Sequence, residues 1–427
     1  MDTEPNDPRI AVVVSFQQLP LKLFSAYGSE LGQTPHFDRM ASRGVLFDQH
    51  FADDLGEDRL RHAWWDGMTT YSAENESNAG PSLAEQSASA GIECHLISDS
   101  PPAEWEIAPD GWDTTYLESS SDSVGESLSQ LFSTAESILS EIRGRGAKAI
   151  VWIYSREMPS IPIPEMTFLE LYLNELPQLS EPETEPSPTA EDEEETEDVE
   201  ENAISEDERT AAFELIEETL SLISTENAEP ESLHIKTLNV LAAARLSEWD
   251  HELGKFFDRL EPEIDAGRSV FFLTSDRGLP LWESAVTQQL DRHQHSGPIQ
   301  EETAHLPLLL VHGNQDLGER HGALTSPADL PASLLDWFGM SSDFPDGRSL
   351  WSLVRGDVEE LHTHLTCRAG DWESLREPEW LLIRNRRKGI EKLYIKPEDR
   401  WQVLDVLSQY IDEADRLISL LNQSARS

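Results

Sequence analysis

Two adjacent amides, Gln17 and Gln18, follow an apolar run in the stretch RIAVVVSFQQLP. The run Ile10–Val14 predicts a buried strand of a parallel sheet. In open α/β sheets, ligands and metal ions are held outside the carboxyl ends of the strands. An amide oxygen can ligate calcium, although it brings no charge to the site. The pair is therefore either a binding site or what remains of one.

Histidine pairs suggest a second kind of chemistry. His293 and His295 form one H-x-H pair, and His362 and His364 form another. On a strand, both members of such a pair share a face and could bind zinc. No carboxylate or cysteine stands at ligand spacing beside them. We therefore expect them to be exposed histidines in loops.

The two cysteines and one pair of tryptophans are further candidates for a functional role. Cys94 and Cys367 make neither a disulfide framework nor a zinc pattern, so we expect two buried small hydrophobic residues. Trp64 and Trp65, in RHAWWDG, could stack on a sugar ring. Packing of at least one of them in the core is the favoured interpretation.

Strand-like runs alternate with helical patterns along most of the chain. Strands are expected at 10–14, 45–47, 93–97, 149–154 and 269–274 and in HLPLLLVHG. Amphipathic helices are expected between them, including a long one before the strand at 269–274. This alternation predicts an α/β fold with a mainly parallel central sheet flanked by helices.

The chain is strongly acidic, with a formal charge of -50 over 427 residues. Such a chain repels phosphates and anionic lipids, which excludes nucleic acid and membrane surfaces as partners. Part of the excess lies in residues 181–208, which hold 15 acidic residues and no Lys or Arg. This segment cannot bury enough apolar area to offset its chain entropy, so we expect a disordered acidic insert.

The two ends of the chain differ from its middle. Residues 1–8 are expected to be flexible, and 9–355 to form the main α/β domain. In 356–427, EWLLIRNRRKGIEKLYIK predicts two strands around a turn, and PEDRWQVLDVLSQYIDEADRLISLLNQ predicts a closing helix. These would form a C-terminal α+β subdomain. No signal peptide or membrane span is recognisable, so the expected compartment is the cytoplasm.

Several longer phrases carry more specific information. The first contains Tyr27-Gly28 and continues through Thr34–Phe47 as TPHFDRMASRGVLF. Later phrases are SLAEQSASAGIECHLISDS, EWDHELGKFFDRL, VFFLTSDRG, HLPLLLVHG, PADLPASLLDWFGM and DGRSLWSLVRGD. Read in this order, they resemble the sulfatase family, within the alkaline-phosphatase-like superfamily. The resemblance covers nearly the whole chain and implies that 9–355 is a sulfatase-like domain.

The resemblance also implies a particular chemistry, the hydrolysis of sulfate esters. Sulfatases use a divalent cation, usually calcium, and a Cys or Ser that is converted to formylglycine. Carboxylates hold this hard cation because their charge and oxygen atoms suit it. Lys, His and Arg side chains hold the sulfate and its developing charge.

The cation site is altered at the matching positions. The family's Asp-Asp at the end of the first strand falls on Gln17 and Gln18, so two anions are missing. A later Asp is kept as Asp276, but the Asn or His ligand beside it is replaced by Arg277. A guanidinium carries only donors and does not ligate a metal.

The groups that act on the sulfate are altered as well. The nucleophile position falls on Glu57 and the family's Arg on Arg61, or, if the alignment slips by two, on Leu55 and Arg59. Neither alignment supplies a Cys or Ser. The sulfate-binding Lys is replaced by Asp99, and the His that usually follows the VWIYS strand has no counterpart.

These concerted losses favour a pseudoenzyme with a degenerate active site. It would bind or scaffold an unknown protein or small-molecule ligand and need no metal cofactor. The alternative is a sulfate or phosphate ester hydrolase that holds calcium or another divalent cation through rearranged ligands, for which the candidates are Asp53, Asp54, Asp58 and Asp276. In a third interpretation, the acidic insert carries the function and the folded domain only presents it.

Arg277 suggests a more specific hypothesis. Placed between Asp276 and Glu57, its guanidinium could supply the positive charge that a metal ion would bring. The former metal site would then be rebuilt as a buried ion pair, and the fold would be stable without a cation.

Overall fold

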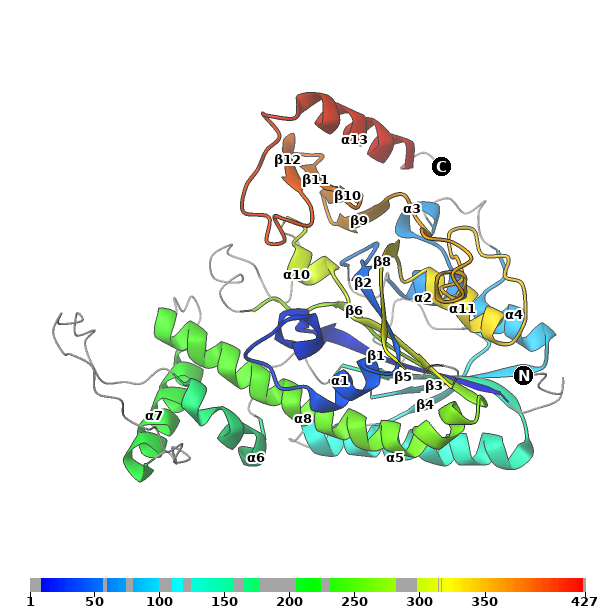
Figure 1. Ribbon diagram of the computed structural model, residues 1–427, viewed down its shortest axis with the longest axis horizontal. Helices are drawn as coiled ribbons and strands as arrows, with labels where there is room; N and C mark the ends of the chain where they lie inside the picture. The colour runs from blue at the N-terminus through cyan, green and yellow to red at the C-terminus, as the bar shows by residue number, and fades with distance from the viewer. Residues whose placement is uncertain are drawn as a thin grey trace.

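The computed structural model describes residues 9–56, 60–73, 80–99, 110–117, 124–156, 164–176, 205–223, 231–281, 298–313, 315 and 317–424. Its centre is an eight-stranded sheet with the order β4-β3-β5-β1-β6-β7-β2-β8 (Figure 1). The strands are β1 Ile10–Leu19, β2 Val45–His50, β3 Ile92–Ser98, β4 Asp113–Tyr116, β5 Lys148–Ser155, β6 Ser269–Gly278, β7 Leu308–His312 and β8 Glu319–Thr325. Within this sheet β7 alone runs against its neighbours. The predicted mainly parallel sheet is confirmed.

Helices cover both faces of this sheet. Successive side chains of β1 point to opposite faces, so Val12 and Val14 join one apolar cluster while Ala11 and Val13 join another. The first face is covered by α1 Pro35–Ala41, α5 Val124–Arg145 and α8 Ser232–Asp265. The second face is covered by α2 Leu60–Asp66, α4 Leu83–Ser89, α11 Asp329–Trp337 and α12 Trp351–Val354. The expected α/β layering is therefore present.

Further helices complete the described chain. They are α3 Thr70–Ala73, α6 Met166–Leu169, α7 Glu206–Ile223, α10 Glu301–Ala304 and α13 Ile411–Ser424, with 3₁₀ turns at Leu21–Leu23, Ser25–Tyr27 and Glu170–Glu175. None of the helices in the described ranges is long and apolar enough to cross a membrane.

A carboxylate of α8 holds the start of α1. Asp250 is buried, and its two oxygens accept the backbone N–H groups of His36 and Phe37 at 2.9 and 2.7 Å. These are amides at the helix start that have no partner within the helix. Two phrases noted in the sequence, TPHFD and EWDHELG, therefore meet in space although they are more than 200 residues apart.

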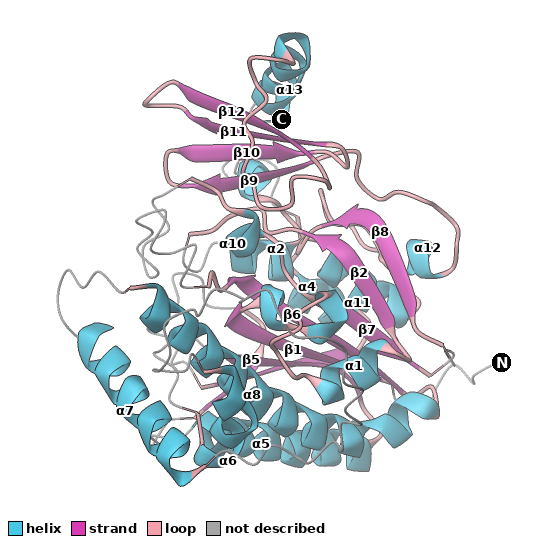
Figure 2. Ribbon diagram, turned by 60° about the vertical axis from the view of Figure 1, so that its left-hand side comes forward, coloured by secondary structure: helices cyan, strands magenta, loops and turns pink. Residues whose placement is uncertain are grey.

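A second, four-stranded antiparallel sheet lies beyond the first, with α13 on its outer side (Figure 2). Its strands are β9 Leu365–Ala369, β10 Trp372–Arg376, β11 Trp380–Asn385 and β12 Ile390–Ile395. The two predicted strands correspond to β11 and β12, whereas β9 and β10 were not predicted. The small C-terminal α+β arrangement is confirmed.

The closing helix is shorter than its sequence pattern indicates. It begins at Ile411, because residues 397–410 form turns held by two aspartates. The Asp399 carboxylate accepts the N–H groups of Val403 and Leu404, both at 2.8 Å. Asp405 likewise accepts N–H groups of Leu393 and Leu407. Side chains of this kind satisfy the backbone in turns and so compete with a helix.

The last residues of the acidic insert, predicted to be disordered over 181–208, belong to a helix. Residues 181–204 lie outside the described ranges, but Glu206 begins α7. Ser205 and Glu208 form reciprocal hydrogen bonds, since the hydroxyl accepts the N–H of Glu208 and the carboxylate accepts the N–H of Ser205. This capping box, with acids in the first turn, starts a helix. The prediction was wrong for 205–208.

Candidate functional site

The strand order brings most of the expected site residues to one edge of the large sheet. Four strands, β3, β5, β1 and β6, are consecutive neighbours. At or just beyond their carboxyl ends lie Asp99, Ser155, the Gln17-Gln18 pair and Asp276-Arg277. Both β1 and β6 are longer than predicted and include these residues. Gln18 lies directly opposite Arg277 in the parallel register.

Asp99 fastens the end of β5. Its carboxylate accepts a hydrogen bond from the Ser155 hydroxyl at 2.5 Å and from the backbone N–H of Arg156 at 3.0 Å. The Arg156 side chain continues the network, because its Nε donates to the Gln17 side-chain oxygen at 3.4 Å. Ser155 and Arg156 were missed in the sequence analysis. The signal was the polar pair that follows the VWIY run of β5.

Asp276 and Arg277 lie on the other side of the Gln17-Gln18 pair. The Tyr154 hydroxyl, buried in the sheet, donates to Asp276 Oδ2 at 2.9 Å. Arg277 is only 5% exposed, and its Nη1 donates to the Leu55 carbonyl oxygen at 3.4 Å. The one retained carboxylate thus accepts a hydrogen bond from a tyrosine, and a guanidinium occupies the neighbouring position.

Two other predicted positions cannot be placed in this network. Glu57 lies outside the described residues, so the ion pair expected between Arg277 and Glu57 stays a prediction. Arg61 belongs to α2, and its side chain lies outside the description. Leu55, the other position considered for the nucleophile, is buried and lends only its carbonyl oxygen to Arg277.

Asp53 and Asp54, candidates for rearranged metal ligands, follow β2. Asp53 is 4% exposed, and its Oδ2 accepts the N–H of Thr70 at 2.7 Å and the Thr70 hydroxyl at 3.1 Å. Burial, together with the neighbouring charge of Asp54, raises the pKa of Asp53 to about 7. Asp58, the third carboxylate of this loop, lies outside the described residues. Among the residues that are described, no group of three or more His, Cys, Asp or Glu could hold a metal ion.

Asp53 borders a polar cleft of about 280 Å³ between the two sheets. Asp346, Arg348, His362, His364 and Thr366 also line it. His362 and His364 lie in the loop before β9, as expected, but they are partly buried rather than exposed. His362 Nε2 lies 2.9 Å from the buried Asp329 carboxylate, a partner distant in sequence. His293 and His295 lie outside the described residues.

The tryptophans and cysteines behave as predicted. Trp64 and Trp65 are both buried, and the Trp64 ring packs against Trp152 with centroids 5.1 Å apart. Cys94 and Cys367 are buried free thiols. Burial raises the pKa of Cys94 to about 11, which leaves it an unreactive thiol.

Comparisons with known proteins agree with this architecture. A family model described as Sulfatase matches residues 184–340. The fold is similar to that of a protein solved with its substrate D-glucosamine-2-N,6-O-disulfate, with a TM-score of 0.69, 15% identity and 98% of each chain covered. A search among curated proteins finds no matching relative.

Two further solved structures share the fold. A phosphonate monoester hydrolase from Silicibacter pomeroyi has a TM-score of 0.68 at 16% identity, over 98% of this chain and 94% of that one. A putative sulfatase from Bacteroides thetaiotaomicron has a TM-score of 0.67 at 14% identity, over 98% of this chain and 93% of that one. At such identities the likeness establishes the fold and not the activity.

The side chains at the matched metal positions do not fit a divalent cation. Gln17 and Gln18 bring amides where two anions are needed, and Asp276 already accepts the Tyr154 hydroxyl. Arg277 brings a positive charge, which would repel a cation held beside it. The arrangement can hold a polar network together, and it lacks the ligand charge that a hard cation requires.

Proposed function

Because this chain belongs to the sulfatase family, within the alkaline-phosphatase-like superfamily, we propose that it keeps the family's fold but has lost sulfuric ester hydrolysis. It would serve instead as a binding or scaffold protein for a protein or small-molecule partner. Its charge of -50 disfavours nucleic acid and anionic membranes as that partner. The cytoplasmic location inferred from the sequence stays a prediction.

The observation that carries this proposal is the hydrogen-bonded edge of β3, β5, β1 and β6. Catalysis in this fold requires a cation, a nucleophile and groups that bind the sulfate. Here Arg277 lies opposite Gln18, Asp276 accepts the Tyr154 hydroxyl, and Asp99 fastens Ser155. Each of these side chains takes part in the contacts of the sheet edge, and Arg277 brings a positive charge to the place where a metal ion would need anionic ligands.

One observation favours the alternative, a divalent-metal-dependent hydrolase of sulfate or phosphate esters. Asp53 is a buried carboxylate with a pKa of about 7, and it borders the polar cleft. Carboxylates of this kind act as general acids or bases near neutral pH. Together with Asp54, Asp58 and Asp276 it would belong to the rearranged ligand set. One of the structural neighbours is a phosphonate monoester hydrolase, which makes phosphonate esters a further substrate class to assay.

Metal content and turnover together separate the two functions. We expect the purified full-length protein to contain no stoichiometric metal and to hydrolyse neither aryl sulfate nor aryl phosphate nor phosphonate monoesters above the level of Asp276→Ala. Elemental analysis and chromogenic substrates give these readouts. Stoichiometric calcium, zinc or manganese, with turnover that disappears in Asp276→Ala, would establish the hydrolase instead.

The contribution of the Arg277 charge to stability can be tested without an activity assay. We expect Arg277→Ala to cost about 3–5 kcal/mol of stability, because it would remove one partner of the buried ion pair predicted between Arg277 and Glu57, and EDTA to leave the melting temperature of the wild type unchanged. Arg387→Ala is a matched control, since Arg387 is 79% exposed and its loss should cost less than about 0.5 kcal/mol. A clear drop in the wild-type melting temperature on chelation would contradict the proposal.

A further inference from the structure

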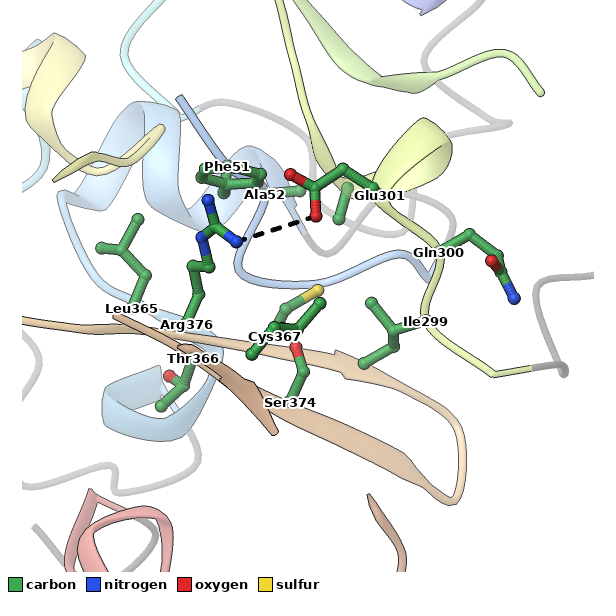
Figure 3. Close-up of a pocket in the computed structure, with 12 residues that line it drawn as sticks. Phe51, Ala52, Ile299, Gln300, Glu301, Leu365, Thr366, Cys367, Ser374 and Arg376 are labelled. Carbon is green, nitrogen blue, oxygen red and sulfur yellow. Dashed lines mark ion pairs between the residues drawn. The ribbon is translucent and has the colours of Figure 1, made fainter. Parts of the chain in front are cut away.

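A small cavity lies where the second sheet meets the first, and we call it the seam cavity. Phe51, Ile299 and Glu301 line it from the main domain, and Thr366, Cys367 and Arg376 line it from β9 and β10 (Figure 3). It has room, about 20 Å³, for one water-sized particle. Figure 3 shows the Arg376 side chain extending toward Phe51 and Glu301.

Arg376 is buried with most of its hydrogen-bonding capacity unused. The residue is 6% exposed, and its Nη2 donates to the Gln49 side-chain oxygen at 3.3 Å. Among the described residues, its Nε and Nη1 have no hydrogen-bond partner. The distance from Nη1 to Glu301 Oε2 is 3.9 Å, too long for a hydrogen bond. A buried guanidinium with unsatisfied N–H groups is costly, so a ligand that accepts them would stabilise the fold.

The charge around the cavity is also unbalanced. Lys396 Nζ lies 2.8 Å from Glu301 Oε2 and also donates to the carbonyl oxygens of Asp399 and Arg400. Glu301 is therefore already paired with one cation before Arg376 is considered. Arg376 and Lys396 thus share the single carboxylate of Glu301, which leaves a net positive charge on these three side chains.

His305 lies beside this site and adds no positive charge to it. Its ring stacks on Phe51, the residue over which the Arg376 guanidinium lies. Burial is the main cause that lowers the pKa of His305 to about 4; the charge of Glu301 opposes this effect, and the charges of Arg400 and Arg376 act with burial. The histidine is therefore neutral at physiological pH and leaves the excess charge on Arg376.

We propose that the seam cavity binds a monoatomic anion, chloride under cellular conditions, through the Nε and Nη1 groups of Arg376. Water could satisfy these donors but could not neutralise the guanidinium. The cavity has room for one water-sized particle, which favours a monoatomic anion over a tetrahedral oxyanion such as sulfate. The ion would tie Arg376 of β10 to the main domain, where Gln49 and Phe51 already contact it. This role is independent of any catalytic activity.

Melting temperatures in matched salts test the site on the intact protein. A chain with a charge of -50 gains stability from any salt by screening, so sodium chloride is compared with sodium gluconate at equal ionic strength. We expect chloride to raise the melting temperature by a further 1–3 °C, roughly, and to saturate below about 0.15 M. No chloride-specific increase, or one that begins only at molar concentration, would overturn the proposal.

Variants show whether the increase comes from Arg376. Arg376→Met keeps an apolar stem of similar length but removes the donors, and we expect it to lose the chloride-specific increase while keeping the general salt effect. Arg384→Met is the matched control, since Arg384 is a buried arginine of the same sheet, bonded to Glu373 at 2.9 Å. It should lose stability yet keep the chloride-specific increase. An unchanged increase in Arg376→Met would overturn the assignment.

Bromide locates the ion directly in the wild type, even if Arg376→Met does not fold. Crystals soaked in sodium bromide should give an anomalous peak in the seam cavity, in contact with Nε and Nη1 of Arg376. Density for a water molecule alone, with no anomalous signal, would contradict the proposal. A failed hydrolase assay would not affect this result, so the two proposals are tested separately.

Discussion

Asp53 illustrates how a single side chain acquires unusual properties from its position. It follows a strand, and the fold buries it against Thr70 and beside Asp54. Two hydrogen bonds from Thr70 lower its pKa, but burial and the charge of Asp54 outweigh them and raise it to about 7. Between pH 4 and pH 7 the folded protein therefore holds a proton on Asp53 that the unfolded chain has released. Stability from this group is lost as the pH rises through that range.

Asp53→Asn should remove this pH dependence. The amide keeps an oxygen for the Thr70 donors but cannot ionise. We expect the free energy of unfolding of the wild type to fall by roughly 2–3 kcal/mol more than that of the variant between pH 5 and pH 8. Urea denaturation at both pH values measures it. The buried His50 and His305 have lowered pKa values and oppose the trend in both proteins, so they cancel in the comparison. If the stability of the two proteins changed with pH in parallel, Asp53 would not be the group that releases its proton in this range.

At the scale of elements, side chains distant in sequence decide where helices and strands begin and end. The seven-residue helix α1 is too short to be stable alone. It is held because Asp250 of α8 accepts two of its first amides and because Phe37 and Met40 pack into the core. The start of α1 thus depends on α8, which covers the same face of the sheet.

Asp250→Ala should weaken this attachment. The change leaves the amides of His36 and Phe37 buried without an acceptor, and we expect a loss of about 2 kcal/mol in the free energy of unfolding at pH 7.5. Asp258→Ala is the control, because Asp258 is half exposed on the same helix and pairs with Arg39. Its loss should cost less than about 0.5 kcal/mol. Equal effects of the two substitutions would mean that the cap contributes no more than a surface charge.

At the scale of the whole molecule, the second sheet is built onto the first. Leu365, Trp372 and Ile383 belong to the same apolar cluster as Val13 of β1. Main-chain hydrogen bonds also connect the two parts, since Leu55 N–H donates to the Arg368 carbonyl at 2.8 Å. In return, Arg368 N–H donates to the Asp53 carbonyl at 3.0 Å. The loop after β2 therefore extends the edge of the second sheet at β9.

Such a shared core predicts one cooperative unfolding transition. Trp152 is buried in the large sheet, while Trp380 packs against Tyr410 in the C-terminal part. The change in tryptophan fluorescence that Trp152→Phe or Trp380→Phe removes from the wild-type signal reports on each place. We expect these two difference signals and far-UV circular dichroism to give coincident transitions in urea. Separate midpoints for the two tryptophans would show that 356–427 unfolds on its own.

Much of the fold could be predicted because it depends on local patterns. The apolar runs of β1, β5 and β6 and the long amphipathic pattern of α8 each indicate their element directly. β9 and β10 were missed because their sequences, LTCRA and WESLR, mix polar and apolar residues without a long apolar run. The start of α7 and the turns after β12 depend on side-chain hydrogen bonds that a pattern does not display.

The sequence by itself determined the α/β alternation, the acidic charge and the types of residue at the candidate site. It showed amides in place of two carboxylates, and Arg277 beside Asp276. Only the tertiary structure decided which of these groups meet. Tyr154 reaches Asp276 across 122 residues of sequence, and Arg376 lies beside a cavity formed by three separate segments. The reason is physical: strand order and sheet packing set these contacts, and both depend on burial of the whole apolar surface at once.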